Sequence, residues 1–559
     1  MSHNTLYLLL TSILVGILLG ILGATAAHYF RTGIYFIEQF IESNFQTTNN
    51  FIIIFCSLSV AACLITLIKI RFGVTNWQGP ADTIFAAHRV DNELDIKTGV
   101  ASTLAAFLSA AGGASVGQYG PLVHFGATLG SWIKAILKLR ISTDIILGGG
   151  VAAAISAGFN APLAGIIFAH EAILRHFSLK ALAPIALASG TAFLIHNYLW
   201  DASTPLIGLY SGIELGPMIL LTILAGPFFG LVAILFMFTL ITFSKLPRKI
   251  GLNQFQSILI AIIGLSSIGT FYPEVMGLGT STIVNLTTGN TLLFAATTIL
   301  VAKIIATALS LGFGFFGGVF SPALLVGAAA GSVATSVLNF LGIHYFQGLD
   351  LVICGMAAVA GSVIGAPISM IIIVLELTGS YGLALTSTIG IVTSTMVSGR
   401  LFDHSLFDRQ LLNRGIDLSQ GRIGIRLMEE NITSIMSLAV LKFKPGVSIR
   451  EATAEMVKLQ CNEAYIISNE GKYIGKCHLN SIIFARPSDT VVKYIDKEAL
   501  NIKSDASLQQ AIEAAADFVG ETIPIVDRKT GVLLGTINEG DLFNVYLDIQ
   551  GQTIDLEKK

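Results

Sequence analysis

The chain has 559 residues, of which 53% are hydrophobic and 12% are charged, and its mean hydropathy is +0.74. These values exclude an ordinary soluble enzyme and predict that most of the chain lies in a lipid bilayer. The formal net charge of −2, without long basic runs, excludes nucleic acid as a partner.

Apolar stretches long enough to enter or cross a bilayer recur from the N-terminus to about residue 400. The first contains residues 7–27, which resemble a secretory signal; no Lys or Arg precedes them and similar stretches follow, so we expect a membrane span. Many of the 56 glycines lie in these stretches, and Gly and Pro interrupt several of them, which predicts broken helices. The stretches are residues 5–41, 50–68, 99–116, 145–173, 179–199, 213–243, 255–271, 291–313, 322–340, 350–377 and 383–399.

A duplication relates two parts of this region about 200 residues apart. Two sets of small, Pro and Glu positions recur in the same order: Gly117, Pro121, Gly126 and Gly130 match Gly318, Pro322, Gly327 and Gly331, while Gly150, Ala161, Pro162 and Glu171 match Gly355, Ala366, Pro367 and Glu376. We therefore expect a membrane domain over residues 1–420 with related halves at about 1–200 and 205–420. Transporters built in this way commonly place their site where broken helices meet at the bilayer midplane.

The matched segments GQYGP (117–121) and GVFSP (318–322) each interrupt an apolar stretch and are expected to start a new helix, with proline in its first turn. A helix start presents unpaired N–H groups and a partial positive charge, so two starts that converge form an anion site without a buried full charge. Neither segment contains Lys or Arg, and weak sites of this kind permit rapid release.

At these residues the chain resembles the CLC family of chloride channels and proton-coupled chloride transporters. GVFSP fits the family's GxFxP motif, GQYGP stands where the family has G(K/R)EGP, and FNAPLAGIIFAHE (159–171) and SLFD (405–408) also correspond. The resemblance covers nearly the whole chain. It implies an all-α polytopic membrane protein of tilted and broken helices, in which inverted halves enclose an anion path in each subunit of a homodimer.

The chain departs from the family at both positions that handle protons. The gating glutamate of the second motif is Tyr119, whose phenol is neutral at neutral pH but can still block the path or donate its hydroxyl. The inner proton-transfer glutamate of many exchangers aligns with Ala172, next to Glu171. Glu171 is either proton-linked or, with its repeat partner Glu376, a structural helix cap; we favour the cap.

Two further anion contacts of the family are altered. The serine of its GSGIP motif corresponds to Trp77 in NWQGP (76–80), and its central tyrosine corresponds to Phe407, which has no hydroxyl. The indole N–H of Trp77 is a donor without an acceptor, although this ring can also be a plain interfacial aromatic. The predicted anion pathway therefore rests mostly on main-chain amides and comprises Trp77, Gly117, Gln118, Tyr119, Gly120, Gly318, Val319, Phe320 and Phe407.

These replacements predict uncoupled or channel-like movement of chloride or a similar small anion. Proton-coupled antiport remains the alternative, because His124 and His170 titrate near neutrality and can supply a different proton route. A lone histidine on an apolar helix is nevertheless more often a core residue.

After about residue 420 charged residues appear regularly and no segment could span a membrane, which predicts a soluble α/β domain over 425–559. Residues 430–484 and 492–548 resemble a pair of CBS motifs, which are common on CLC proteins. Such pairs often bind adenosine nucleotides, and Asn538 and Asp541 match the binding positions of the second copy. A purely structural or dimerising tail is equally compatible with the sequence.

Other classes of function find little support. No paired carboxylates, nucleophile elbow or metal cluster lies at the repeat junction, and the five cysteines have no zinc or disulfide spacing, so we expect neither an enzyme nor a metal site, and no required cofactor. A cation transporter and a non-conducting nucleotide sensor remain weaker alternatives. Basic residues in short connections predict a multi-pass protein of the plasma or bacterial inner membrane with a cytoplasmic C-terminal domain; these residues are Lys69, Arg71, Lys245, Arg248 and Lys249.

Overall fold

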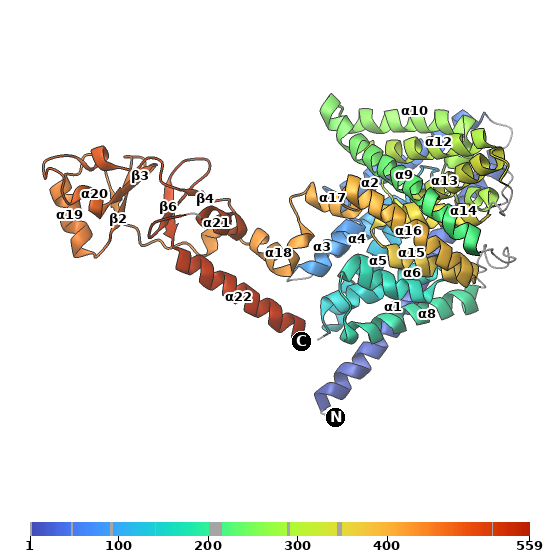
Figure 1. Cartoon of the computed structure of the whole chain (residues 1–559), viewed down its shortest axis with the longest axis horizontal. Coiled ribbons are helices and arrows are strands. Elements are labelled where there is room, and N and C mark those ends of the chain that lie inside the picture. The colour runs from blue at the N-terminus through green and yellow to red at the C-terminus, as the bar shows by residue number, and fades with distance from the viewer. Residues whose placement is uncertain are drawn as a thin grey trace. The chain divides into compact units, whose positions relative to one another are not determined.

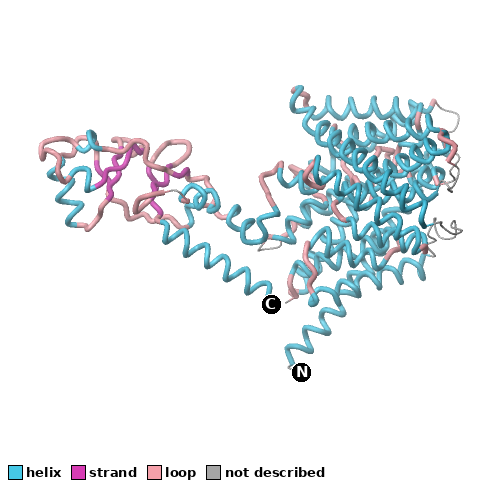
Figure 2. Tube along the Cα trace, viewed as in Figure 1, coloured by secondary structure: helices cyan, strands magenta, loops and turns pink. Residues whose placement is uncertain are grey.

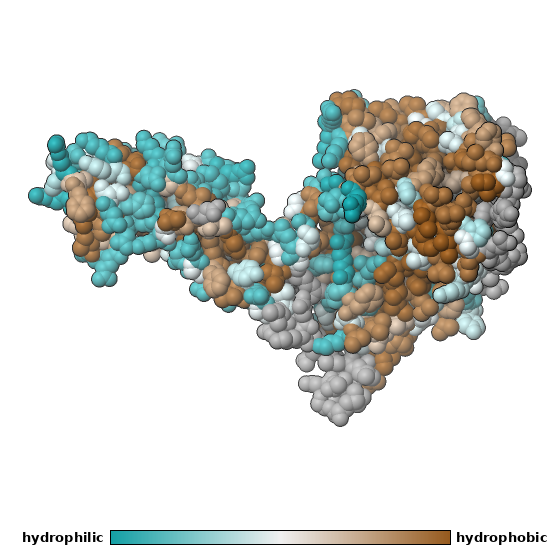
Figure 3. All heavy atoms as spheres, viewed as in Figure 1, coloured by the Kyte–Doolittle hydropathy of each residue, from teal (hydrophilic) through white to brown (hydrophobic). Residues whose placement is uncertain are grey.

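The computed structural model describes residues 3–45, 49–89, 93–139, 141–200, 215–287, 291–343, 349–516 and 518–558. The chain divides into two compact units, Met1–Arg414 and Gly415–Lys559, so the division falls a few residues before the one expected at 420–425. In the first unit the described elements are helical, and strands occur in the second unit (Figure 2). On the face drawn in Figure 3, apolar residues cover most of the first unit whereas polar residues are common on the second.

The first unit is a bundle of helices (Figure 1). Among the described helices, eight are long and apolar enough to cross a membrane. Its first half contains α1 (His3–Phe45), α2 (Asn50–Phe72), α3 (Pro80–His88), α4 (Ile96–Ala111), α5 (Tyr119–Leu137), α6 (Thr143–Phe159), α7 (Pro162–Phe168) with a π-helical turn (Ala169–Leu174), and α8 (Leu179–Trp200). Its second half contains α9 (Leu215–Ile250), α10 (Gln254–Phe271), α11 (Thr280–Leu286), α12 (Leu293–Gly312), α13 (Phe320–Phe340), α14 (Leu349–Ile364), α15 (Pro367–Thr378), α16 (Tyr381–Leu401) and α17 (Leu406–Leu412).

Two of the expected apolar stretches are each a pair of helices. Stretch 145–173 breaks between α6 and α7, where Asn160 adopts φ 55° and Pro162 starts the next helix. Stretch 350–377 breaks in the same way between α14 and α15, where Gly365 adopts φ 78° before Pro367. A left-handed residue ends the first helix, and proline supplies the backbone angle that starts the second.

The matched glycines make the same helix crossing in both halves. A Cβ on Gly150 of α6 would lie 2.0 Å from the carbonyl oxygen of Gly126 in α5. A Cβ on Gly327 of α13 would lie 2.3 Å from the carbonyl oxygen of Gly355 in α14. Helices that pack backbone to backbone leave no room for a side chain, so these four positions require glycine.

The second unit holds two small three-stranded sheets, each with one parallel and one antiparallel pairing. The strands are β1 (Lys442–Phe443), β2 (Glu463–Ile467), β3 (Tyr473–His478), β4 (Ile502–Lys503), β5 (Ile523–Val526) and β6 (Leu533–Ile537). The helices are α18 (Gly421–Glu429), α19 (Ile449–Lys458), α20 (Leu479–Ile482), α21 (Leu508–Ala515) and α22 (Glu539–Lys558).

The start of this unit packs differently from the sequence-based division into copies at 430–484 and 492–548. Leu427 and Ile432 are buried in the core formed by the second copy, and Ser437 pairs with Thr536 of β6. The first copy has its own core, which begins at β1. Leu427 and Ile432 are therefore buried against the second copy and not against the first. Which copy covers them depends on tertiary packing, which the local sequence pattern does not reveal.

Candidate functional site

The two breaks that the sequence singles out meet in the interior of the first unit. The Gly117 N–H donates to the Gly318 carbonyl oxygen (2.7 Å), and the Gly318 N–H donates to the Gly117 carbonyl oxygen (2.8 Å). A Cβ on Gly318 would lie 2.8 Å from Cδ of Pro121, and a Cβ on Gly117 would lie 2.9 Å from Cδ of Pro322. Glycine at both positions therefore allows the starts of α5 and α13 to lie side by side.

Both helix starts lack a side-chain cap. Neither the N-cap residue of α5, Gln118, nor that of α13, Val319, accepts a capping hydrogen bond through its side chain. The first amides of a helix have no acceptor within the helix, so those of Tyr119, Gly120 and Phe320 are donors near a buried surface. The Gln118 amide already donates to Oγ of Ser321 (3.3 Å).

A third helix start, that of α3, lies against the first two. A Cβ on Gly120 would lie 3.1 Å from Cα of Gly318 and 3.4 Å from Cγ of Pro80, the first residue of α3. The start of α3 is capped by its own Asp82, whose Oδ2 accepts from the Gly79 amide (2.8 Å) and whose Oδ1 pairs with Arg414 (2.6 Å). The negative charge of Asp82 is therefore compensated by Arg414 and by the Gly79 amide.

The side chain of Tyr119 lies under aromatic rings and is 8% exposed. Its ring stacks on Phe159 at 3.8 Å between centroids and meets the edge of Phe320 at 5.4 Å. Phe168 lies 6.1 Å from Phe320, and Gly158 gives the Tyr119 ring the space it occupies. The sequence analysis included Phe159 and Phe168 only as members of the family-like stretch 159–171 and assigned them no role, and it did not name Gly158. The available signal was that FNAP (159–162) contains the break between two helices.

The remaining predicted contacts are Trp77 and Phe407. Trp77 packs against Phe316 at 5.8 Å between ring centroids, two residues before Gly318. Phe407 is buried in α17, which packs against α3 and α14, and no ring contact between Phe407 and Tyr119 is found among the described residues.

The two predicted histidines each have one bonded ring nitrogen. Nδ1 of His124, a fully buried residue of α5, is 2.8 Å from Oγ1 of Thr83 in α3. Nδ1 of His170 lies 3.1 Å from the His176 carbonyl oxygen. Within the described part of the chain, Nε2 of each ring is buried without a partner. Neither histidine is joined to the helix starts at Tyr119 and Phe320 by a described hydrogen bond.

The repeated carboxylates cap helices of the opposite half. Oε1 of Glu171 accepts from the Ile368 amide (2.8 Å), and Oε2 accepts from the Ser369 amide (2.7 Å) and its hydroxyl (2.6 Å), at the start of α15. Glu376 of α15 accepts in the same way from the amides of Leu163 and Ala164 in α7, at 2.9 Å each. Both oxygens of Glu171 are therefore engaged in a structural cap, while the neighbouring Ala172 is buried.

The predicted nucleotide residues lie at the start of α22 in the second unit. The side-chain oxygen of Asn538 accepts from the amide of Asp541 (2.7 Å), so Asn538 caps this helix. Asp541 stands in its first turn. The two residues are brought together, but the Asn538 oxygen already has a structural role.

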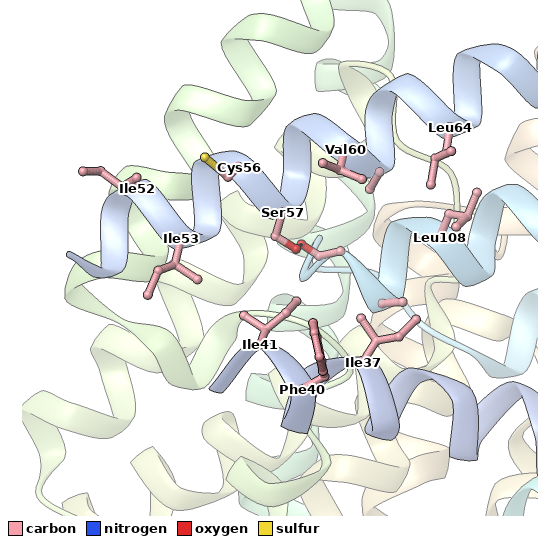
Figure 4. Close-up of a pocket in the computed structure, with 13 residues that line it drawn as sticks. Ile37, Phe40, Ile41, Ile52, Ile53, Cys56, Ser57, Val60, Leu64 and Leu108 are labelled. Carbon is pink, nitrogen blue, oxygen red and sulfur yellow. Dashed lines mark hydrogen bonds between the residues drawn. The ribbon is translucent and has the colours of Figure 1, made fainter. Parts of the chain in front are cut away.

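Two cavities in the described part of the first unit lie away from the paired helix starts. One of about 520 Å³ lies between α1, α2 and α4, where side chains such as Ile37, Phe40, Ile53 and Leu108 point into an apolar hollow (Figure 4). A second of about 510 Å³ lies between α10 and α12. Neither is lined by Tyr119 or Phe320, so neither marks the centre described above.

Comparison with known proteins gives several relatives. The H(+)/Cl(-) exchange transporter ClcA of Klebsiella pneumoniae subsp. pneumoniae is 28% identical over 298 residues, which are 51% of this chain and 62% of that protein. The ClcA of Salmonella agona is 30% identical over 300 residues with the same coverage. The voltage-gated ClC-type chloride channel ClcB of Escherichia coli is 26% identical over 363 residues, 62% of this chain and 84% of that protein. The chain thus spans about three-fifths of the length of the exchange transporters it matches.

Solved structures share the fold. A eukaryotic CLC transporter aligns with a TM-score of 0.64 at 18% identity, over 95% of this chain and 98% of that chain. A CLC-type fluoride/proton antiporter aligns with a TM-score of 0.62 at 22% identity, over 73% of this chain and 98% of that chain. The profile of the family described as voltage gated chloride channel matches residues 61–399, which include both helix starts. Because that match covers more than half of the chain, this protein belongs to the voltage gated chloride channel (CLC) family.

Proposed function

We propose that this protein is a transporter, not an enzyme, and that it moves chloride or a similar small anion past the helix starts at Tyr119 and Phe320. The observation that carries the proposal is the reciprocal backbone bridge between Gly117 and Gly318, which holds two uncapped helix starts together. Helix starts attract anions through N–H donors and the helix dipole, and they do so without a fixed charge that would retain the ion. Chloride appears in the names of the relatives.

The proposed movement is uncoupled or channel-like. Tyr119 has no carboxylate to carry a proton through the outer part of the path, and Ala172 has none for the inner part. The neighbouring carboxylate of Glu171 is occupied on both oxygens by the start of α15. In this proposal the Tyr119 ring is the gate, because it packs against both Phe159 and Phe320 at the two helix starts.

Reconstituted flux with a simultaneous proton readout tests the proposal. Proteoliposomes that contain chloride are diluted into chloride-free buffer with a pH dye, and protein-free liposomes are the control. We expect chloride efflux down the chloride gradient, without proton movement against the proton gradient. Liposomes that stay sealed to halide would contradict anion transport, and potassium in place of chloride as the permeant ion would favour a cation transporter.

Proton-coupled antiport is the second candidate, because several relatives are named exchange transporters. It requires a proton route other than the missing glutamates, for which His124 and His170 each offer an unpaired ring nitrogen. Uphill proton movement driven by chloride in the same assay would establish this candidate. Loss of that movement in His124→Gln or His170→Gln would identify the route.

For the second unit we propose a CBS pair that binds an adenosine nucleotide at Asn538 and Asp541. Two copies of a helix flanked by short strands, and a eukaryotic CLC transporter that aligns over 95% of this chain, support the pair. Binding of ATP, ADP or AMP to the full-length protein, lost in Asp541→Ala, is the expected result. No binding would favour a structural tail, and binding without any halide flux would favour a non-conducting nucleotide sensor.

We also propose that the protein is a homodimer whose second unit is cytoplasmic. Basic residues at the ends of α2 and α9 support this orientation; they are Lys69, Arg71, Arg248 and Lys249. Cross-linking in membranes and protease access to the second unit in right-side-out and inverted vesicles test the two statements separately.

A further inference from the structure

Proton-binding and charged side chains gather where α1 packs against α8 (Figure 1). Nη2 of Arg31 in α1 lies 3.4 Å from Nε2 of His196 in α8. His28, one turn before Arg31, stacks on Trp200 with 4.3 Å between ring centroids, and its own centroid is 6.5 Å from that of His196. Both helices are long and apolar enough to span the membrane, so this group of polar residues lies in an apolar setting.

Among the described residues, the guanidinium of Arg31 has no counter-charge. Arg31 is half-buried, and among the described residues its hydrogen-bond partner is His196 and no carboxylate pairs with it. A charged side chain within a membrane segment is costly unless an opposite charge or a ligand compensates it. The titratable groups that the described contacts place around it are histidines: His196 of α8 at 3.4 Å, and His28 of α1, whose ring centroid is 6.5 Å from that of His196.

The contact with Arg31 determines which nitrogen of His196 carries the proton. A guanidinium can only donate, so Nε2 must accept and the proton of the neutral ring lies on Nδ1. His196 is 1% exposed, and its Nδ1 has no hydrogen-bond partner among the described residues. A buried N–H without an acceptor costs free energy, which indicates that an acceptor is missing from this place.

The group is connected to the centre of the proposed anion path. The ring of Tyr119 stacks on Phe159. The next residue, Asn160, exchanges side-chain hydrogen bonds with Asn197 (3.1 and 2.5 Å), which directly follows His196. The contacts among Phe159, Asn160 and Asn197 therefore link the segment that carries His196 to the ring of Tyr119.

We propose that Arg31 and His196 bind a small monovalent anion at a side-chain site distinct from the amide site, and that its binding is linked to protonation of His196. The physiological role of this site rests on the proposed anion transport, whereas the experiment that tests the site does not depend on transport. A proton on Nε2 would place an imidazolium against the guanidinium, and an anion beside both removes the repulsion. The anion and a proton taken from solvent therefore stabilise each other, with no change in net charge, and linkage makes the effect reciprocal.

The experiment measures proton uptake when sodium bromide is added to the purified full-length protein in lipid nanodiscs, in weakly buffered solution near pH 6.5. We expect uptake by the wild-type protein that saturates with bromide. His196→Gln keeps a side-chain N–H but cannot titrate, and we expect it to lose the uptake. Arg31→Gln should reduce the uptake and weaken bromide binding about tenfold, whereas Arg31→Lys, which keeps the charge, should retain most of both.

Matched controls remove the same side chains elsewhere. Arg71→Gln removes an exposed arginine from the end of α2, and His404→Gln removes a histidine before α17; both should behave as wild type. Unchanged uptake in His196→Gln, or wild-type bromide binding in monodisperse Arg31→Gln, would overturn the proposal. So would absence of uptake in the wild type, the result expected if a water occupies the Nδ1 position. Sealed liposomes together with bromide-driven uptake would reject transport and leave this site standing.

Discussion

Two pairs of helices in the membrane unit begin with proline in the first turn, but only one pair has its first amides capped by carboxylates. The pair α7 and α15 receives a carboxylate from the opposite half, Glu376 and Glu171, on its first free amides. The pair α5 and α13 receives no carboxylate from any described residue and is joined by the backbone bridge of Gly117 and Gly318. A carboxylate that caps a helix start links two parts of the fold, whereas an uncapped helix start keeps N–H donors that attract a mobile anion.

Among the four predictions, Gly318→Ala is expected to have the largest effect, and it disrupts the uncapped pair α5 and α13. The added Cβ would lie 2.8 Å from Cδ of Pro121 and 2.9 Å from the Gly117 carbonyl oxygen, so the two helix starts must separate. We expect anion flux per folded protein to fall about 100-fold, as displacement of a binding site by about 1 Å can do. Gly190→Ala in α8 is the control, because a Cβ there meets nothing within 4 Å. Wild-type flux in Gly318→Ala would show that the bridge is not part of the path.

The gate at the open pair is tested by Tyr119→Ala. Removal of the ring that stacks on Phe159 should raise chloride flux about tenfold, which corresponds to a barrier lowered by about 1.4 kcal/mol. Tyr119→Phe keeps the ring and removes the hydroxyl, so equal flux in this variant and in wild type would assign the gate to steric blocking. A sealed wild-type protein that conducts only as Tyr119→Ala would favour the non-conducting alternative.

The filled pair is tested by Glu171→Gln and Glu376→Gln, measured by thermal unfolding and by flux. Loss of the charged cap should destabilise the membrane unit by about 1.5–3 kcal/mol. Glu171→Gln should cost more, since Glu171 also accepts from the Ser369 hydroxyl. Flux per folded protein should be unchanged in both variants. A change in proton coupling in Glu171→Gln would instead make this residue part of the transport path.

In the second unit a carboxylate also accepts from two successive backbone amides: Glu463 accepts from the amides of Glu521 (3.0 Å) and Thr522 (2.8 Å), just before β5, and pairs with Lys476 at 2.5 Å. Burial opposes ionisation, but the hydrogen bond from Lys476 and those from the amides together hold the pKa of Glu463 below its ordinary value. Its stabilising contribution is therefore present at neutral pH and is lost as pH falls through that lowered pKa.

The acid effect is the smallest of the four, and hydrogen exchange of β5 amides in the full chain measures it. Protection should decrease below the ordinary glutamate range in wild type. The double variant Glu463→Gln/Lys476→Met removes both charges and should lose this pH dependence. Equal pH dependence in both proteins would assign the acid sensitivity to other carboxylates.

The sequence predicted much of the site because duplicated small residues and prolines act locally. The pattern at 117–121 and 318–322 identified both helix starts, and the matched Glu171 and Glu376 indicated a shared structural role. It did not indicate which amides these carboxylates would reach, since each partner lies in the other half. Nor did it indicate the aromatic cover of Tyr119, because Phe159 is about 40 residues away along the chain and arrives by helix packing.

By itself, the sequence determined that the chain enters a bilayer, where its helices break and that no fixed cation stands in the two motifs, because hydropathy, proline and glycine act on their own neighbours. Only the tertiary structure decided which helix starts are filled and which stay open, and that Arg31 of α1 meets His196 of α8. The physical reason is that an amide's or a charge's partner is chosen by distance in space. Residues 165 positions apart in sequence become neighbours only after the helices have packed.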